Sequence, residues 1–288
     1  MHWEEEMTRL MLRCGLVLSL LACSSGAGTP TSGSPSAPVQ PGVGNPPSVF
    51  VPAAYYATAK STLLAGDRVG ASAIRELVGG QFVFVQARLD EAIAQLNTID
   101  PSERAIVKSL TFSAVADLRA HMADVPRDVT WIGLDIESGM TPADEIDPGQ
   151  YVATVQQFAA LVHASGRKAS WGPISAAFDG LERAGRLGDV LSVVDAAVYQ
   201  GQELFQNQGA AALAAELHRQ RARVKGHNAA VDFNAQLWVT RQTPDEVIAG
   251  FTLTRADLDL AIIGAPAGVA WTDIQHILAG LSWRMSPP

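Results

Sequence analysis

The stretch WIGLDIESGMTP, from Trp131 to Pro142, places two carboxylates at the end of a run that otherwise has the pattern of a buried strand. Side chains alternate along a strand, so Asp135 and Glu137 share one face while the aliphatic residues around them face the other way. Two acids on one face of a buried strand are costly unless they are paired, hydrogen-bonded or share a proton. The stretch therefore predicts a strand that ends in a functional site or in a buried polar network.

Apolar, β-branched runs recur on both sides of this stretch, separated by segments with helical periodicity. We expect eight strands, at residues 49–57, 82–87, 105–110, 130–137, 168–174, 193–200, 234–240 and 258–264. We expect helices at residues 89–96, 113–122, 148–163, 208–222, 244–251 and 272–281. Strands that alternate with helices pair in parallel. Eight such units in about 240 residues predict an α/β fold, a (β/α)8 TIM barrel that forms a single domain over residues 49–288.

An open, doubly wound sheet is the alternative arrangement for the same pattern. That fold binds dinucleotides through a glycine-rich turn directly after a strand. Here Gly79 and Gly80 precede an expected strand, whereas Gly201 and Gly209 stand alone. The missing fingerprint favours the barrel and predicts no cofactor.

The first 22 residues have the pattern of a lipoprotein signal peptide. Arg9 and Arg13 precede an apolar run, Cys14 to Ala22, that is too short to span a bilayer as a helix. The run ends in LLAC, which resembles the lipobox of bacterial lipoproteins, and this resemblance implies that Cys23 carries a diacylglycerol group. Residues 23–48 are rich in Ser, Gly and Pro and predict a flexible tether. We expect a domain outside the cytoplasm, anchored to the bacterial cell membrane by the lipid on Cys23.

Two alternatives remain open at this end of the chain. The opening MHWEEE is acidic where a signal peptide should be basic, so Met7 or Met11 is favoured over Met1 as the true start. A signal peptide that is cleaved elsewhere would leave Cys23 without a lipid.

Composition excludes several classes of function. The chain of 288 residues carries a net charge of −8, which argues against nucleic acid as a partner. Its two cysteines, Cys14 and Cys23, precede the barrel, which therefore has neither a disulfide nor a thiol nucleophile. The histidines lack metal-ligand spacing, and no Gly-x-Ser-x-Gly elbow is present. We expect carboxylate chemistry without a metal or a cofactor, in a monomer.

The active site of a barrel lies at the carboxyl ends of its strands, where Asp135 and Glu137 are expected. Polar and aromatic residues on or after later strands are the expected substrate-binding residues: Trp171, Tyr199, Gln200, Gln202, Asn234, Gln236 and Trp271. Amides bind sugar hydroxyls and aromatic rings bind the C–H faces of sugars, so this set predicts a carbohydrate ligand. Alternatively, the tryptophans fill the core and the amides bind loop backbone.

A second catalytic carboxylate is available from two loops. Glu203 lies in the polar segment YQGQELFQNQ and is the preferred partner of Glu137, as nucleophile or base. Glu145 and Asp147 are the alternatives, although Asp147 is better placed to cap a helix that begins at Pro148.

The end of the expected fourth strand resembles that of chitinase-type glycoside hydrolases, the family numbered eighteen. Their motif Asp-Gly-x-Asp-x-Asp-x-Glu is similar here in its last part, Asp135-Ile-Glu137, while Thr130 and Gly133 stand at the two earlier acidic positions. The resemblance implies that Glu137 protonates the glycosidic oxygen and that Asp135 orients the substrate.

Two further positions fit the same family. Tyr199 ends the expected sixth strand and Trp271 follows the eighth, where that family has a tyrosine and a tryptophan at the sugar. The resemblance predicts a glycoside hydrolase-like protein that acts on a cell-envelope glycan. Because two of the family's acids are missing, the alternative is an inactive barrel that binds carbohydrate at the cell surface.

Overall fold

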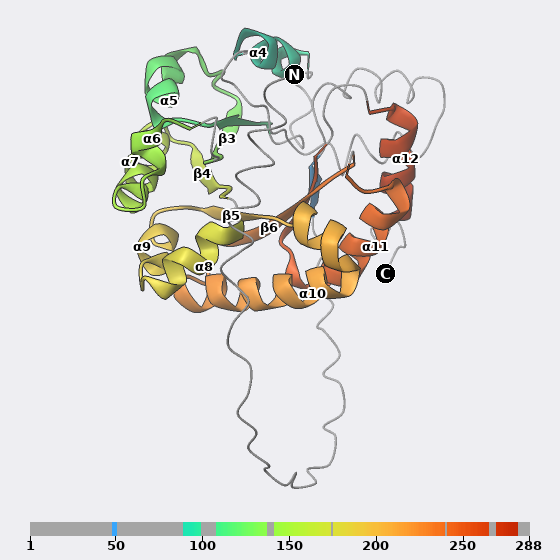
Figure 1. Ribbon diagram of the computed structural model, residues 1–288. Coiled ribbons are helices and arrows are strands. Elements are labelled where there is room, and N and C mark those ends of the chain that lie inside the picture. Colours follow the sequence, from blue (N-terminus) through green and yellow to red (C-terminus); the bar gives the residue numbers. More distant parts are fainter. Residues whose placement is uncertain are drawn as a thin grey trace, which may run out of the picture. The chain divides into compact units, whose positions relative to one another are not determined.

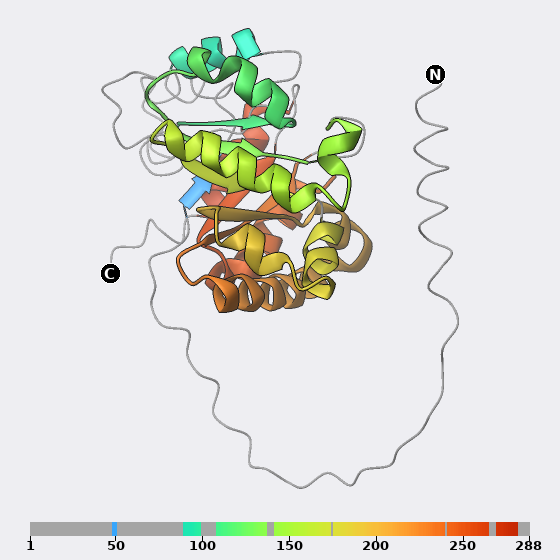
Figure 2. The same ribbon diagram turned by 90° about the vertical axis from the view of Figure 1, so that its left-hand side faces the viewer.

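The computed structural model describes residues 48–50, 89–98, 108–136, 141–173, 175–239, 241–264 and 269–281 (Figures 1 and 2). The chain divides into two compact units, Met1–Pro41 and Gly42–Pro288, and the described residues belong to the second. The expected signal peptide, Cys23, the tether up to residue 47, the strand at 82–87 and Glu137 all lie outside the described residues. Among the helices that are described, none has the length and apolar content needed to cross a bilayer.

Seven parallel strands form one sheet. In chain order they are β1 (Ser48–Phe50), β2 (Lys108–Phe112), β3 (Val129–Leu134), β4 (Lys168–Trp171), β5 (Ala196–Gln200), β6 (Asp232–Trp238) and β7 (Leu260–Gly264). The strands from β2 to β7 lie side by side in sequence order, and β1 pairs with the far edge of β7. A doubly wound sheet reverses its strand order at a switch point, whereas this order progresses in one direction. The sheet is curled, and β1 and β2 are its edges among the described strands (Figure 1).

Seven of the eight expected strands are present, with shifted boundaries. The expected strand at 130–137 is observed as β3, which ends at Leu134. Asp135 still extends the line of the strand, because its N–H donates to Phe112 O at 2.9 Å. The first expected strand, at 49–57, is observed only as the three residues of β1, and the strand at 82–87 stays a prediction.

Helices connect the strands and lie on the outer side of the sheet (Figures 1 and 2). They are α4 (Leu89–Asn97), α5 (Val115–His121), α6 (Ala143–Ile146), α7 (Tyr151–Ala164), α8 (Ser175–Arg183), α9 (Leu187–Leu191), α10 (Gln202–His227), α11 (Pro244–Thr254) and α12 (Trp271–Gly280). Short 3-10 turns follow α5 at Met122–Asp124 and α11 at Arg255–Asp257. The start of α11 is fixed by a capping box between Thr243 and Glu246, with a proline in the first turn.

The region between β4 and β5 contains two helices, α8 and α9, that we did not predict from the sequence. Gly180, Gly185 and Gly188 weaken the helical pattern there. The two helices are held by apolar anchors instead, since Phe178 and Leu187 are fully buried.

The segment YQGQELFQNQ also differs from expectation, because α10 begins within it at Gln202 rather than near residue 208. Gly209, with φ 82° and ψ −180°, interrupts the helical backbone and separates this first part of α10 from the rest. The expected polar loop is therefore a short helical segment whose first residue, Gln202, is buried.

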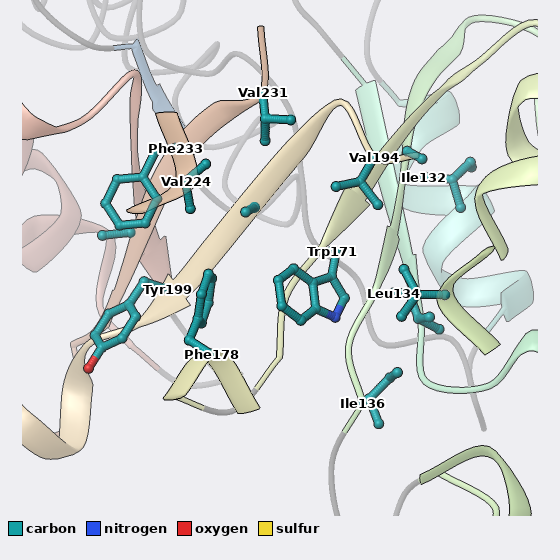
Figure 3. Close-up of a cluster of buried hydrophobic side chains, with 14 of the residues drawn as sticks. Ile132, Leu134, Ile136, Trp171, Phe178, Val194, Tyr199, Val224, Val231 and Phe233 are labelled. Atoms are coloured by element: carbon teal, nitrogen blue, oxygen red, sulfur yellow. The ribbon is translucent and has the colours of Figure 1, made fainter. Parts of the chain in front are cut away.

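The outer face of the sheet, against the helices, forms the apolar core. Its strand residues are buried and apolar: Leu110, Phe112, Ile132, Leu134, Ala169, Trp171, Ala197, Tyr199, Phe233, Ala235, Leu237, Ala261 and Ile263. Figure 3 shows the middle of this cluster, where the ring of Trp171 lies between Leu134 and Phe178. Since alternate residues face opposite sides, the residues between these positions form the inner face of the sheet.

Candidate functional site

The inner face of the sheet is rich in polar side chains. Parallel register places Thr111 beside Gly133 and Gln200 beside Gln236. Asp135 lies two residues beyond Gly133, toward the carboxyl end of β3. The same face carries Ser109, Ser170, Gly172, Val198 and Asn234. Five neighbouring strands thus bring hydroxyl, amide and carboxylate groups to one surface.

A chain of amide hydrogen bonds holds the carboxylate of Asp135. Gln200 Nε2 donates to Asp135 Oδ1 at 2.9 Å, and Gln202 Nε2 donates to Gln200 Oε1 at 3.1 Å. The backbone oxygen of Gln202 accepts from Gln242 Nε2 at 3.0 Å. Because Gln202 occupies the side-chain oxygen of Gln200, the amino group of Gln200 faces Asp135. The chain keeps Asp135, which is only 6% exposed, in the role of a hydrogen-bond acceptor.

A small pocket lies beside Asp135 on the inner face. It is lined by residues from β2 to β6 and from their carboxyl ends: Thr111, Gly133, Leu134, Asp135, Gly172, Val198, Gln200 and Gln236. Its water-accessible volume is about 10 Å³, which is roughly the space that one water molecule needs. Gly133 leaves room for the side chain of Thr111, because a Cβ atom there would lie 2.6 Å from Thr111 Oγ1.

Some buried polar atoms of the described residues have no hydrogen-bond partner. On the inner face these include Thr111 Oγ1 and Asn234 Oδ1, in side chains that are 2% and 5% exposed, and Trp238 Nε1 farther along β6. An unpaired polar atom in a protein interior is costly. Each therefore marks a position where a water molecule or a ligand group gains a hydrogen bond.

The charge of Asp135 also acts on Tyr151, at the start of α7. Burial raises the pKa of Tyr151 above its usual value, the hydrogen bond with Trp171 opposes this, and the negative charge of Asp135 adds to the increase. Tyr151 Oη accepts from Trp171 Nε1 at 3.1 Å. The phenol therefore stays neutral at physiological pH and supports the indole of Trp171 rather than exchanging protons.

Trp171 and Tyr199 were expected to bind substrate, and the structure corrects both predictions. Trp171 is fully buried and Tyr199 is 4% exposed, in the core on the outer face of the sheet (Figure 3). Phe178 joins them, with ring centroids 4.9 Å from Trp171 and 5.9 Å from Tyr199. Burial and the charge of Glu216 raise the pKa of Tyr199, so this phenol is also neutral. The alternative of core tryptophans holds for Trp171.

Glu203 and Trp271 were also expected in the site, as the second carboxylate and as a substrate-binding residue. The side chain of Glu203 is 62% exposed, and its carboxylate lies 3.6 Å from Arg241 Nη1. This exposure and the pairing with Arg241 do not support Glu203 as the second catalytic carboxylate. Trp271 begins α12 and packs, half-buried, against the apolar core.

Glu145 and Asp147 have local structural roles. Glu145 accepts hydrogen bonds from the N–H groups of Val115 at 2.7 Å and Ala116 at 3.1 Å, and so caps the start of α5, where Ala114 has no capping side chain. Asp147 Oδ1 accepts from the N–H of Gly149 at 2.8 Å, in the turn before α7. The interpretation of Glu145 as a second catalytic acid is therefore wrong.

Of the expected site residues, the inner face brings together Asp135, Gln200, Asn234 and Gln236, and Gln202 at the start of α10 binds Gln200. Glu137 follows two residues after Asp135 and lies outside the described residues. Within the described ranges, no group of three or more His, Cys, Asp or Glu side chains is arranged to hold a metal ion.

Sequence reasoning missed Thr111, Gly133 as a pocket residue, and Gln242. The alternation of polar and apolar residues in KSLTF contains the signal for Thr111, because Ser109 and Thr111 fall on the face opposite Leu110 and Phe112. Gln242 gives no such signal, since its contact with Gln202 spans 40 residues.

Comparisons with known proteins give no family for this chain. No protein-family model matches it, and no curated protein matches it. Among solved structures, triosephosphate isomerase from Bartonella henselae aligns with 70% of this chain and 98% of its own length, at 11% sequence identity and a TM-score of 0.37. The fold is therefore described from the strand order and the parallel pairing of the chain itself.

Proposed function

We propose that this chain is a glycoside hydrolase-like protein that binds and cleaves a glycan outside the cytoplasm. The observation that carries the proposal is the buried carboxylate of Asp135, held by Gln200 at the carboxyl end of a parallel strand. Gln236 and Asn234 extend the same face with amide groups. Such groups match the hydroxyl donors and acceptors of a sugar.

The proposal includes a closed barrel. β1 lies beside β7, and β2 forms the opposite edge of the described sheet. A strand at residues 82–87 would pair with both edges and complete an eight-stranded (β/α)8 barrel. The inner face would then become the interior and the upper rim of that barrel.

In the proposed reaction Glu137 is the general acid that protonates the leaving glycosidic oxygen, while a water molecule bonds to the anomeric carbon and returns its proton to the Glu137 carboxylate. Asp135 stays an acceptor, because Gln200 donates to it, and orients a polar group of the substrate. Because Glu203 is exposed, it is not available as the second carboxylate that we preferred. Among the described residues, Asp135 is then the group that stabilises the positive charge developing on the sugar.

A carbohydrate-binding protein without catalysis is the second candidate. Glu203 is paired with Arg241, so Asp135 is the one carboxylate that lines the described pocket. A single carboxylate favours binding over catalysis. An inactive barrel needs only the amides, the hydroxyl groups and Asp135.

Substitution of Glu137 separates the two candidates. We expect Glu137→Gln to reduce the release of reducing ends from cell-wall fragments and polysaccharides by at least about 100-fold, because it removes the titrating proton and keeps the shape. Binding to the same glycans, measured by calorimetry, should stay within about threefold. Glu203→Gln is the matched control and should retain full activity. Full activity of Glu137→Gln would exclude Glu137 as the acid, and binding without release in the wild type would favour the binding protein.

We also propose that the domain is held at the cell membrane by a lipid on Cys23. The support is the LLAC motif and the Ser, Gly and Pro-rich segment that follows it. Cys23→Ser should move the protein from the membrane fraction to the soluble extracytoplasmic fraction. Retention of the variant in the membrane fraction would contradict the lipid anchor.

A further inference from the structure

The pocket beside Asp135 contains a hydroxyl group without a partner. Thr111 is 2% exposed, and its Oγ1 atom makes no hydrogen bond in the described part of the chain. A Cβ atom on Gly133 would lie 2.6 Å from this oxygen, so the absence of a side chain at Gly133 leaves the hydroxyl room at the floor of the pocket. Valine would fill the place of Thr111 without an unpaired polar atom, and a threonine there is costly unless another group binds it.

The size of the pocket limits what that group can be. A water-accessible volume of about 10 Å³ holds roughly one water molecule. A phosphate, a carboxylate or an acetamido group is too large for it. A single hydroxyl group, carried by a larger ligand that lies above the pocket, has the right size.

The chemistry of the lining favours the same group. One carboxylate, two primary amides and one hydroxyl line the pocket, and its described lining includes no Lys, Arg or His. The carboxylate of Asp135 disfavours an anion. A neutral hydroxyl both donates and accepts, so it can donate to a carboxylate oxygen while accepting from Thr111 Oγ1.

We propose that this pocket is a subsite for one hydroxyl group of a neutral polyhydroxylated ligand, and that Thr111 recognises this group through a hydrogen bond. The inference rests on the proposed function, because it names the group of the glycan that enters the site. It assigns Thr111 a specificity role, whereas Asp135 and Gln200 supply the polar walls.

Substitution of Thr111 tests the proposal in the full chain. Thr111→Val keeps the shape and removes the hydroxyl, while Thr111→Ser keeps the hydroxyl and is the matched control. Calorimetric titration with tetra-N-acetylchitotetraose and with cellotetraose should show about fivefold to tenfold weaker binding for Thr111→Val. Thr111→Ser should bind within about threefold of the wild type.

Thermal unfolding without ligand separates this role from a structural one. Thr111→Val should unfold at the same temperature as the wild type or higher, because it removes an unpaired buried oxygen. If this variant does not fold, Thr111→Ala takes its place in the titration. Equal binding of either sugar to the wild type and to the variant without the hydroxyl would overturn the subsite and leave glycan binding intact.

Failure of the wild type to bind both sugars would count against the proposed function, and a crystal structure then decides the subsite separately. A water molecule bound to Thr111 Oγ1 in the wild type, absent from Thr111→Val, would support a site for one hydroxyl-sized group. A wild-type pocket that contains no water molecule, or that is filled by side chains of the protein, would overturn the proposed hydroxyl subsite.

Discussion

Two glycines allow backbone or side-chain arrangements that no other residue permits. Gly133 leaves room for the hydroxyl of Thr111. Gly209 adopts φ 82° and ψ −180° inside α10, in a region that is essentially restricted to glycine. This break separates the short helical segment that begins at Gln202 from the long helix after it.

We expect Gly209→Ala to destabilise the protein by about 1–3 kcal/mol, because a Cβ atom strains this backbone conformation. Gly226 is the matched control in the same helix, since a Cβ there would meet no atom within 4 Å and its φ is not positive. Gly226→Ala should stabilise the helix by up to about 1 kcal/mol. Urea denaturation of both variants measures the difference, and equal effects of the two would contradict the special role of Gly209.

At the level of single residues, the alternation of side chains along a strand predicts which face of the sheet each side chain points to better than residue type does. The alternation around Asp135 correctly separates the acid from Ile132 and Leu134. In β4 the same alternation places Lys168 and Ser170 on one face and Ala169 and Trp171 on the other, so it assigns the indole to the apolar face. The prediction that Trp171 binds substrate is wrong because it rested on residue type rather than on this alternation.

At the level of elements, the amino ends of the strands are tied together by aspartates. Asp195, before β5, accepts from the N–H of Ala169 in β4 at 2.7 Å. Asp259, before β7, accepts from the N–H of Phe233 in β6 at 2.8 Å and pairs with Lys225 Nζ at 2.9 Å. These contacts lie at the end of the sheet opposite Asp135, which in barrels contributes to stability.

Asp259 and Asp232, the first residue of β6, should respond oppositely to substitution. Burial alone would raise the pKa of Asp259, but Lys225, the N–H of Phe233 and Arg221 outweigh it and hold this pKa below its usual value. Burial and the charge of Asp259 raise the pKa of Asp232. Ionised Asp259 therefore stabilises the fold, whereas ionised Asp232 opposes it.

We expect Asp259→Asn to lower the free energy of unfolding by about 1–3 kcal/mol at pH 7. A lowered pKa gives stability that is present above the unfolded value near about 4 and lost as the pH falls through the folded value, so the difference should shrink toward pH 3. Asp232→Asn, the control, should be neutral or stabilising at pH 7, with an effect that also fades as the pH falls. Urea denaturation at pH 3, 5 and 7 measures both, and a loss of stability in both variants at pH 7 would contradict the assignment.

Element prediction from the sequence worked where apolar runs are continuous and failed where glycine interrupts them. β5 and β7 come from runs of Ala, Val and Ile and appear close to their expected positions. α8 and α9 were missed, because tertiary contacts of Phe178 and Leu187 stabilise helices that the local pattern does not indicate.

At the level of the whole molecule, β1 and β2 are the two edges of the described sheet, and the closed barrel that we propose needs a further strand between them. We expect the backbone amides of residues 82–87 to exchange with deuterium as slowly as those of β2 and β7, because a strand paired on both sides has protected N–H groups. Hydrogen exchange followed by mass spectrometry measures this, with peptides from β5 as the protected reference. Exchange of residues 82–87 at the rate of an unfolded peptide would contradict a closed eight-stranded barrel.

The cap of α5 has a consequence for the order in which the molecule folds. The N–H groups of Val115 and Ala116 are bound by Glu145, 30 and 29 residues later in the chain. The first turn of α5 therefore gains its cap only after β3 and the connection beyond it have come into place, and closing that loop carries an entropic cost. A nascent chain that ends before Glu145 contains the sequence of α5 but lacks the carboxylate that caps its first turn. The stability of the first turn of α5 is thus coupled to the position of α6, because the residue that caps it belongs to that helix.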